Sequence, residues 1–164
     1  MKSYIVVLSW IALGLALFTT LYIQNVYPLD IAVGYISRAQ SAGYAEDMVS
    51  YVKQALQYMP QEGNPVWIFP TTRTDFNLIN KDLNTIVGRL STVATLPRES
   101  SAYSQALNDI RERLSVIVEN VGEAMPYIMF SPTNLTIILL WLFSLLAVIR
   151  LSRKFRTEKQ TALR

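Results

Sequence analysis

The sequence contains no cysteine and no histidine among its 164 residues. Because thiolates and imidazoles are common ligands of zinc and haem iron, this composition excludes zinc sites of the Cys/His kind and haem held by those side chains. It also excludes disulfides and every nucleophile–base pair that needs a cysteine or a histidine. We therefore expect a protein that is not an enzyme and that binds no cofactor and no metal.

Charged residues are missing from two long stretches, residues 3–29 and 124–149. The first contains an apolar run of 20 residues, 4–23, which as a helix would be about 30 Å long and match a hydrocarbon core. We predict a membrane helix over residues 4–27. A cleaved signal peptide is the alternative, but the run is long for a signal core and no A-x-A pattern follows it.

The second uncharged stretch has a clear helix start. Ser131 suits the N-cap and Pro132 the first helical position, where its missing N–H leaves no hydrogen bond unmade. From Pro132 to Leu151 there are again 20 residues. We predict a second membrane helix over residues 131–151.

Basic residues gather after the second span, with six Lys/Arg against one acid in residues 150–164. Residues 24–149 hold eight Lys/Arg against eleven Asp/Glu. Because basic flanks stay in the cytoplasm, residues 1–3 and the tail 152–164 should be cytoplasmic and residues 28–130 extracytoplasmic. The sequence thus predicts an integral protein of the cell membrane.

The basic tail, residues 152–164, has two interpretations. It determines topology, or it also binds anionic lipid head groups, at about 1 kcal/mol per basic residue near the surface. Nucleic acid is not an expected partner, because the tail is short and holds a single aromatic residue.

Between the spans, residues 28–126, apolar residues recur at helical spacing. We predict an all-α fold in which two transmembrane helices flank a small antiparallel helical bundle. The clearest apolar stripes are Ala45, Met48, Val49, Val52, Ala55, Leu56 and Met59; then Phe76, Ile79, Leu83, Ile86, Val87, Leu90 and Ala94; then Tyr103, Leu107, Ile110, Leu114, Ile117, Val121 and Ala124.

The expected helix ends follow from prolines and caps. Pro28 should end or bend the first helix, so that a short helix covers residues 29–41. Thr74 should cap the third bundle helix, with Asp75 in its first turn, and Pro126 should close the fourth.

A proline-rich loop, residues 60–74, interrupts the helical pattern. Pro65 and Pro70 bracket Val66, Trp67, Ile68 and Phe69 and favour an extended strip, with Arg73 beside it. The strip either lies across the bundle and buries alternate side chains, or docks on another subunit through its aromatic residues.

Within the first span, Ala12 and Ala16 are spaced as small-x-x-x-small around Gly14. Such a face lets another membrane helix approach closely. No charged residue lies inside the spans before Arg150, at the end of the second, which argues against a proton or ion path within this chain alone.

Without cysteine and histidine, a catalytic metal could be bound only through oxygen atoms, chiefly those of carboxylates. The candidate carboxylate pairs are Glu46 with Asp47, Asp75 with Asp82, and Glu119 with Glu123. Each is interpreted as a solvated helix face.

The preferred hypothesis is a non-catalytic accessory subunit of a membrane complex of the respiratory or oxidase/monooxygenase type, bracing other integral membrane subunits. The alternatives are a ligand-sensing or substrate-delivery ectodomain and, third, an enzyme with a carboxylate-bound metal.

Overall fold

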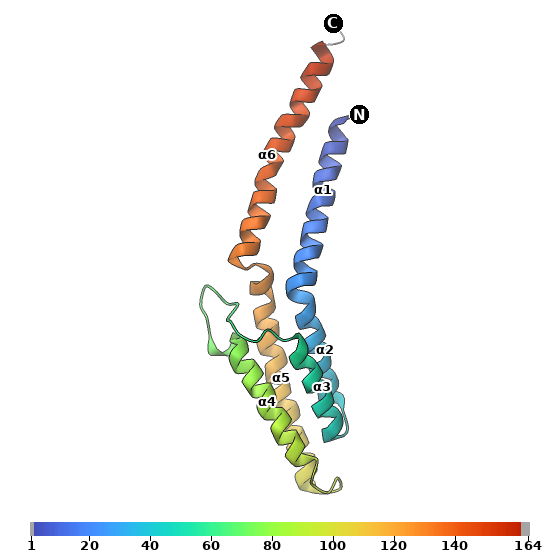
Figure 1. The fold of residues 1–164 in the computed structure, drawn as a ribbon, viewed down its shortest axis with the longest axis vertical. Coiled ribbons are helices and arrows are strands. Elements are labelled where there is room, and N and C mark those ends of the chain that lie inside the picture. The colour runs from blue at the N-terminus through green and yellow to red at the C-terminus, as the bar shows by residue number, and fades with distance from the viewer. Residues whose placement is uncertain (1, 162–164) are drawn as a thin grey trace. The chain divides into compact units, whose positions relative to one another are not determined.

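The computed structural model describes residues 2–161, with side chains described for residues 4–150 and for Arg153. Every regular element in this range is helical, as the sequence predicts. Figure 1 shows them along the chain. They are α1 (Lys2–Leu21), the π-helical turn η1 (Tyr22–Val26), α2 (Tyr27–Ser41), α3 (Ala45–Tyr58), the 3-10 turn η2 (Thr72–Thr74), α4 (Phe76–Val93), α5 (Ser101–Met129) and α6 (Pro132–Thr161).

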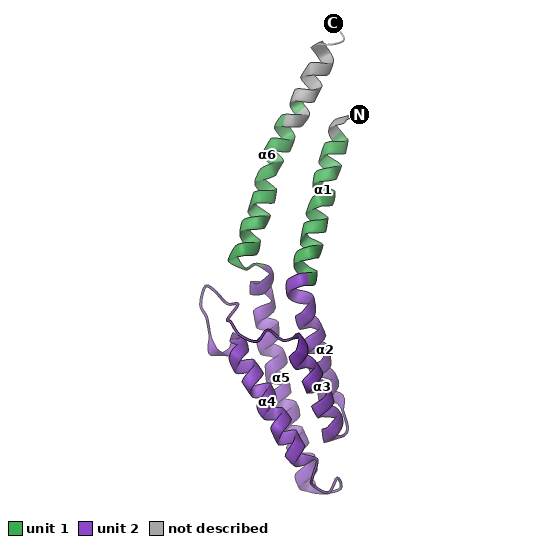
Figure 2. Cartoon of the chain, viewed as in Figure 1, with its two compact units in different colours: residues 1–23, 130–164 green, residues 24–129 purple. Residues whose placement is uncertain are grey.

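The chain divides into two compact units (Figure 2). One comprises residues 1–23 and 130–164 and contains α1 and α6. The other, residues 24–129, contains α2 to α5. By length and composition, the helical stretches 4–41 and 101–150 are each apolar enough over 18 residues to cross a membrane.

In residues 24–129, α2 to α5 form a four-helix bundle around one continuous apolar core. Successive helices run in opposite directions along the bundle (Figure 1). The stripes predicted for α3, α4 and α5 all face this core, fully or partly buried, and the seven residues predicted for α5 are its seven buried residues. Helical periodicity therefore identified the inward faces correctly.

Of the two outcomes expected at Pro28, an end or a bend of the first helix, the helix end is not observed. Helical residues continue from Lys2 to Ser41, and Pro28 occupies the first turn of α2. A proline in a helix leaves the carbonyl four residues earlier without its N–H partner and crowds it sterically. The π-helical turn η1, which widens the helix just upstream, accommodates both effects.

Pro126 does not close α5 either. The helix continues to Met129, with Pro126 inside it. The flanking residues explain why: Ala124 is buried, and Met125 and Ile128 pack against the core. Packing of this apolar face outweighs the lost hydrogen bond.

The N-cap of α4 is Asp75 rather than Thr74. The Asp75 carboxylate accepts a hydrogen bond from the Asn77 backbone N–H at 2.9 Å. Thr74 is 2% exposed and bonds to the preceding loop instead. Both residue types are good N-caps. Asp75 takes this position because the Thr74 hydroxyl is bound to the Asn64 side chain.

One end of the bundle is held by side chains that reach between helices. The Arg111 guanidinium on α5 donates to the carbonyl oxygens of Gln40 at 3.0 Å and Ala42 at 2.8 Å, at the C-terminal end of α2. At the start of α3, the Ala45 N–H donates to the Tyr103 hydroxyl at 2.9 Å. These bonds satisfy groups that a helix end leaves without intrahelical partners.

An exposed ion pair lies at the same end. Arg98 donates to Glu46 at 2.9 Å, and its guanidinium lies over the Tyr44 ring, 4.7 Å from the centroid. The Glu46 backbone N–H and then Arg98 lower the pKa of the Glu46 carboxyl. The same pairing raises the pKa of Arg98.

In the other unit, α1 and α6 pack against each other through aromatic side chains. The rings of Trp10 and Trp141 stack with centroids 4.1 Å apart, and Phe18 meets Trp141 edge-on at 5.9 Å. The Ser131 hydroxyl accepts the Asn134 N–H at 3.3 Å, which confirms the predicted N-cap of α6. The backbone helix extends beyond the expected end at residue 151.

Candidate functional site

The segment between α3 and α4 folds into a closed loop, residues 64–71, here called the 64–71 loop. Asn64 closes it: its side-chain N–H donates to the Thr71 carbonyl at 2.6 Å, while its side-chain oxygen accepts the Val66 N–H at 3.1 Å. The same oxygen accepts the hydroxyl of buried Thr74 at 3.0 Å. One asparagine thus fixes both arms of the loop.

A second set of hydrogen bonds attaches the loop to α4. The Phe76 N–H donates to the Gly63 carbonyl at 3.0 Å, and Gly63 has φ +101°, a conformation that favours glycine. The buried Asn80 side chain donates to the carbonyls of Pro60 and Phe76. Because both ends are held, the loop is presented in a defined shape.

The tip of the loop is apolar and largely exposed. Val66 is 8% exposed, whereas Trp67, Ile68 and Phe69 are 47%, 52% and 80% exposed. Alternate burial across the bundle, one of the two interpretations from sequence, is therefore not observed. A rigid loop that displays three neighbouring apolar side chains is typical of a contact surface.

The loop lies at the end of the bundle where the chain enters and leaves this unit (Figure 2). Gln24, Asn25, Gly63, Asn64 and Ile128 line one shallow open depression there. Nearby, Arg73 pairs with Glu123 of α5 at 3.8 Å, with both side chains about half exposed. Arg73 is thus engaged by a carboxylate of its own chain.

The small residues of α1 fall on different faces. Gly14 is buried, and a Cβ there would overlap the indole ring of Trp141. Ala12 and Ala16 are exposed. The glycine thus serves the packing of α1 on α6 within the chain, while the two alanines remain on a face that a further helix can approach.

The aromatic cluster between α1 and α6 was not singled out from the sequence. Trp10 donates its indole N–H to the Ser144 hydroxyl at 2.8 Å, and that hydroxyl donates to the Trp141 carbonyl at 2.6 Å. The available signal was a tryptophan in each span, with Ser144 one turn from Trp141. Sequence spacing alone does not reveal pairing across 131 positions.

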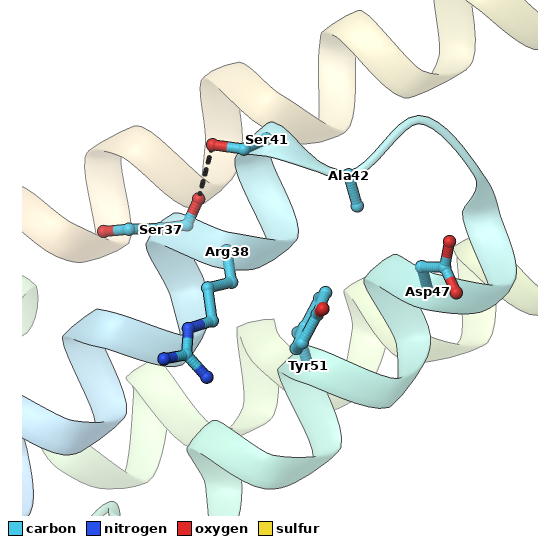
Figure 3. A pocket seen from close by; sticks show the side chains of 6 residues that line it. All are labelled: Ser37, Arg38, Ser41, Ala42, Asp47 and Tyr51. Atoms are coloured by element: carbon cyan, nitrogen blue, oxygen red, sulfur yellow. Dashed lines mark hydrogen bonds between the residues drawn. The ribbon is translucent and has the colours of Figure 1, made fainter.

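A shallow depression between α2 and α3 carries charged and polar groups (Figure 3). Its lining residues are Ser37, Arg38, Ser41, Ala42, Asp47 and Tyr51. The Ser41 hydroxyl donates to the Ser37 carbonyl at 3.1 Å, so it serves its own helix. The depression is open to solvent, and the Arg38 guanidinium lies 5.4 Å from the centroid of the Tyr35 ring.

Three of the six carboxylates considered from the sequence bind a basic side chain or a backbone N–H of the same chain. Glu46 pairs with Arg98, and Glu123 with Arg73. Asp75 caps α4. Among the residues whose side chains are described, no three His, Cys, Asp or Glu gather so that they could hold a metal ion. The lipid-binding interpretation of the tail falls mainly on side chains outside those described.

Comparison of the chain with protein-family models, with curated proteins and with solved structures found no match. The function is therefore inferred from the residues themselves.

Proposed function

We propose that this chain is a non-catalytic accessory subunit of a multi-subunit membrane complex. The two apolar helices anchor it and pack on partner helices, and the bundle of residues 24–129 stands outside the membrane and braces the partner subunits. Both termini are cytoplasmic in this arrangement, as the basic tail favours.

The observation that carries the proposal is the filled core of the bundle. All four helices contribute fully buried apolar side chains, among them Ile36, Met48, Leu83 and Leu114. In helical bundles, ligand and cofactor sites are built in the core from side chains on facing helices. A bundle whose core holds its own apolar side chains works through its outer surface, as a structural subunit does.

The membrane helices support the same function. Their outward faces carry exposed apolar residues such as Leu13, Leu15, Leu140 and Phe143, which suit lipid or a neighbouring helix. Ala12 and Ala16 leave room for close helix contact. Within the spans, residues 4–27 and 131–149 carry no charged side chain that would serve transport by this chain alone.

The test is gentle extraction of native membranes followed by affinity purification of the tagged chain and native mass spectrometry. We expect other integral membrane proteins to copurify in fixed ratio. Double substitution of Ala12 and Ala16 by leucine should weaken this association, whereas leucine at exposed Ile11 should not. A chain that runs as a monomer, with no larger assembly in native extracts, would contradict the proposal.

A further inference from the structure

We propose that the tip of the 64–71 loop is seated in the lipid head-group region of the bilayer that the chain spans. This would give the bundle a third attachment to the membrane besides its two helices. The inference rests on the proposed membrane insertion of α1 and α6, but not on membership of a complex.

The position of the loop is the first argument. Its base shares a surface depression with Gln24 and Ile128, which lie beside the two points where the chain enters and leaves the bundle unit. Arg73, just after the loop, pairs with Glu123, which is six residues before the end of α5 at Met129. Six residues of helix correspond to about 9 Å. The base of the loop is therefore close, along α5, to the residue at which the chain leaves the bundle unit for the second proposed span.

The chemistry of the tip is the second argument. Residues 65–71 carry no charge, and their exposed residues are Trp67, Ile68, Phe69, Pro70 and Thr71. Tryptophan is enriched at membrane–water interfaces, where its ring sits among the head groups and its N–H remains hydrated. The nearest charged residues in the sequence, Glu62 and Arg73, lie outside the tip, before and after it.

The rigidity of the loop is the third argument. Asn64 and Thr74 hold its base through hydrogen bonds, and Asn80 binds the Pro60 carbonyl just before it, so little conformational freedom remains to be lost on contact. Lipid is the expected contact rather than a protein partner, because this end of the bundle is the one whose residues, 24 and 129, continue directly into the two proposed spans.

Tryptophan fluorescence of the full chain reconstituted in phosphatidylcholine vesicles tests the inference. The chain has three tryptophans, so single-tryptophan proteins follow from paired Trp→Phe substitutions. Trp67 alone should show blue-shifted emission that is quenched by lipids brominated on their acyl chains. As a control, Y44W in a protein whose natural tryptophans are all phenylalanine places the probe on an exposed residue at the opposite end of the bundle, and it should be quenched by aqueous iodide instead.

A protein that keeps only Trp10 reports on membrane insertion separately. If Trp10 is quenched by brominated lipid while Trp67 is quenched only by iodide, the loop inference is overturned and the anchored chain stands. If neither is quenched by lipid, insertion itself fails and the loop inference fails with it. Protection of Trp67 from iodide in native membranes, but not in the pure reconstituted protein, would assign the tip to a protein partner and also overturn the inference.

A second probe avoids removing tryptophans. Because the chain lacks cysteine, F69C can carry a single nitroxide at the most exposed position of the tip. Compared with a nitroxide at Y44C, the nitroxide at F69C should collide more often with oxygen, which partitions into lipid. It should collide less often with a water-soluble nickel chelate. Equal accessibilities at the two positions would contradict lipid contact.

Discussion

Arg111 joins α5 to the end of α2 through backbone carbonyls rather than through an opposite charge. Its guanidinium also donates to the Asn108 side chain at 2.8 Å, so three acceptors depend on one residue. R111M would keep much of the aliphatic packing but leave the Gln40 and Ala42 carbonyls without these donors. We expect the free energy of unfolding to fall by about 1–3 kcal/mol. Chemical denaturation in detergent would measure it.

The matched control is R113M, because Arg113 lies exposed on the same helix. Its substitution should leave stability within about 0.5 kcal/mol of the parent chain, as is usual for exposed sites. Equal effects of the two variants would show that the Arg111 bonds contribute nothing particular.

Asn64 has the corresponding role in the 64–71 loop. N64A removes the bonds to Thr71, Val66 and Thr74 and should let the tip move without unfolding the bundle. Hydrogen exchange should become faster in residues 64–74 and stay unchanged in α5. N84A is the control, because the Asn84 side chain bonds only to the carbonyl of Asn80 on its own helix among the bonds described. Unchanged exchange in N64A would mean that the loop is held by other contacts.

The Glu46–Arg98 pair predicts a small pH dependence. The folded-state pKa of Glu46 is lowered below 4.5, so the pairing stabilises the folded chain above the unfolded pKa and is lost as pH falls through the folded value. R98Q should therefore lower the melting temperature slightly at neutral pH. The effect is small because both side chains are at least half exposed.

The difference between R98Q and the parent chain should vanish in acid, once Glu46 is protonated. Melting curves followed by circular dichroism between pH 7 and pH 3 would measure it. A difference that persists in acid would assign the effect of R98Q to its stacking on Tyr44 instead.

At the scale of whole elements, the packing of α1 on α6 depends on Gly14 and the stacked tryptophans. G14L would put a side chain where the Trp141 indole lies and separate the Trp10 and Trp141 rings. We expect loss of the tryptophan exciton signal in circular dichroism and destabilisation of the helix pair by about 1–3 kcal/mol. A12L, at an exposed position on the same helix, should preserve the signal. A retained signal in G14L would contradict the packing described.

The sequence allowed the helices and their inward faces to be predicted, because a 3.6-residue apolar period depends only on local order. Helix ends were less predictable where tertiary contacts outweigh local signals. Pro28 and Pro126 both lie inside helical runs, since a π-helical turn accommodates the first and core packing holds the second. Thr74 had the chemistry of a cap, but the loop uses its hydroxyl instead.

The candidate site was only partly predictable for a related reason. The prolines around residues 66–69 correctly indicated an irregular apolar segment. The choice between a buried and an exposed strip depended on Asn64 and Asn80, whose partners lie up to 20 positions away. The Gly63-Asn64-Pro65 turn signature was the local hint that the strip is a loop tip rather than a covering strand.

At the scale of the whole molecule, the distribution of charge makes a prediction about topology. Residues 24–149 are net acidic and the tail is strongly basic, so the bundle should face outward and the tail the cytoplasm. The absence of cysteine makes the test clean, because a single introduced cysteine is the only thiol that a membrane-impermeant maleimide can label. In intact cells Y44C should be labelled at once, whereas T157C should be labelled only after the membrane is opened.

The basic tail should itself determine this orientation. Replacing Arg150, Arg153 and Lys154 by glutamine removes half of the six positive charges that follow the second span. If these charges hold the tail inside, a fraction of molecules should then insert inverted, with T157C labelled in intact cells and Y44C partly protected. Replacing three basic residues of the bundle, Arg38, Lys53 and Lys81, by glutamine is the matched control and should leave the labelling pattern unchanged. Labelling of Y44C only after lysis of the unmodified chain would place the bundle inside the cell and contradict both the topology and the bracing function built on it.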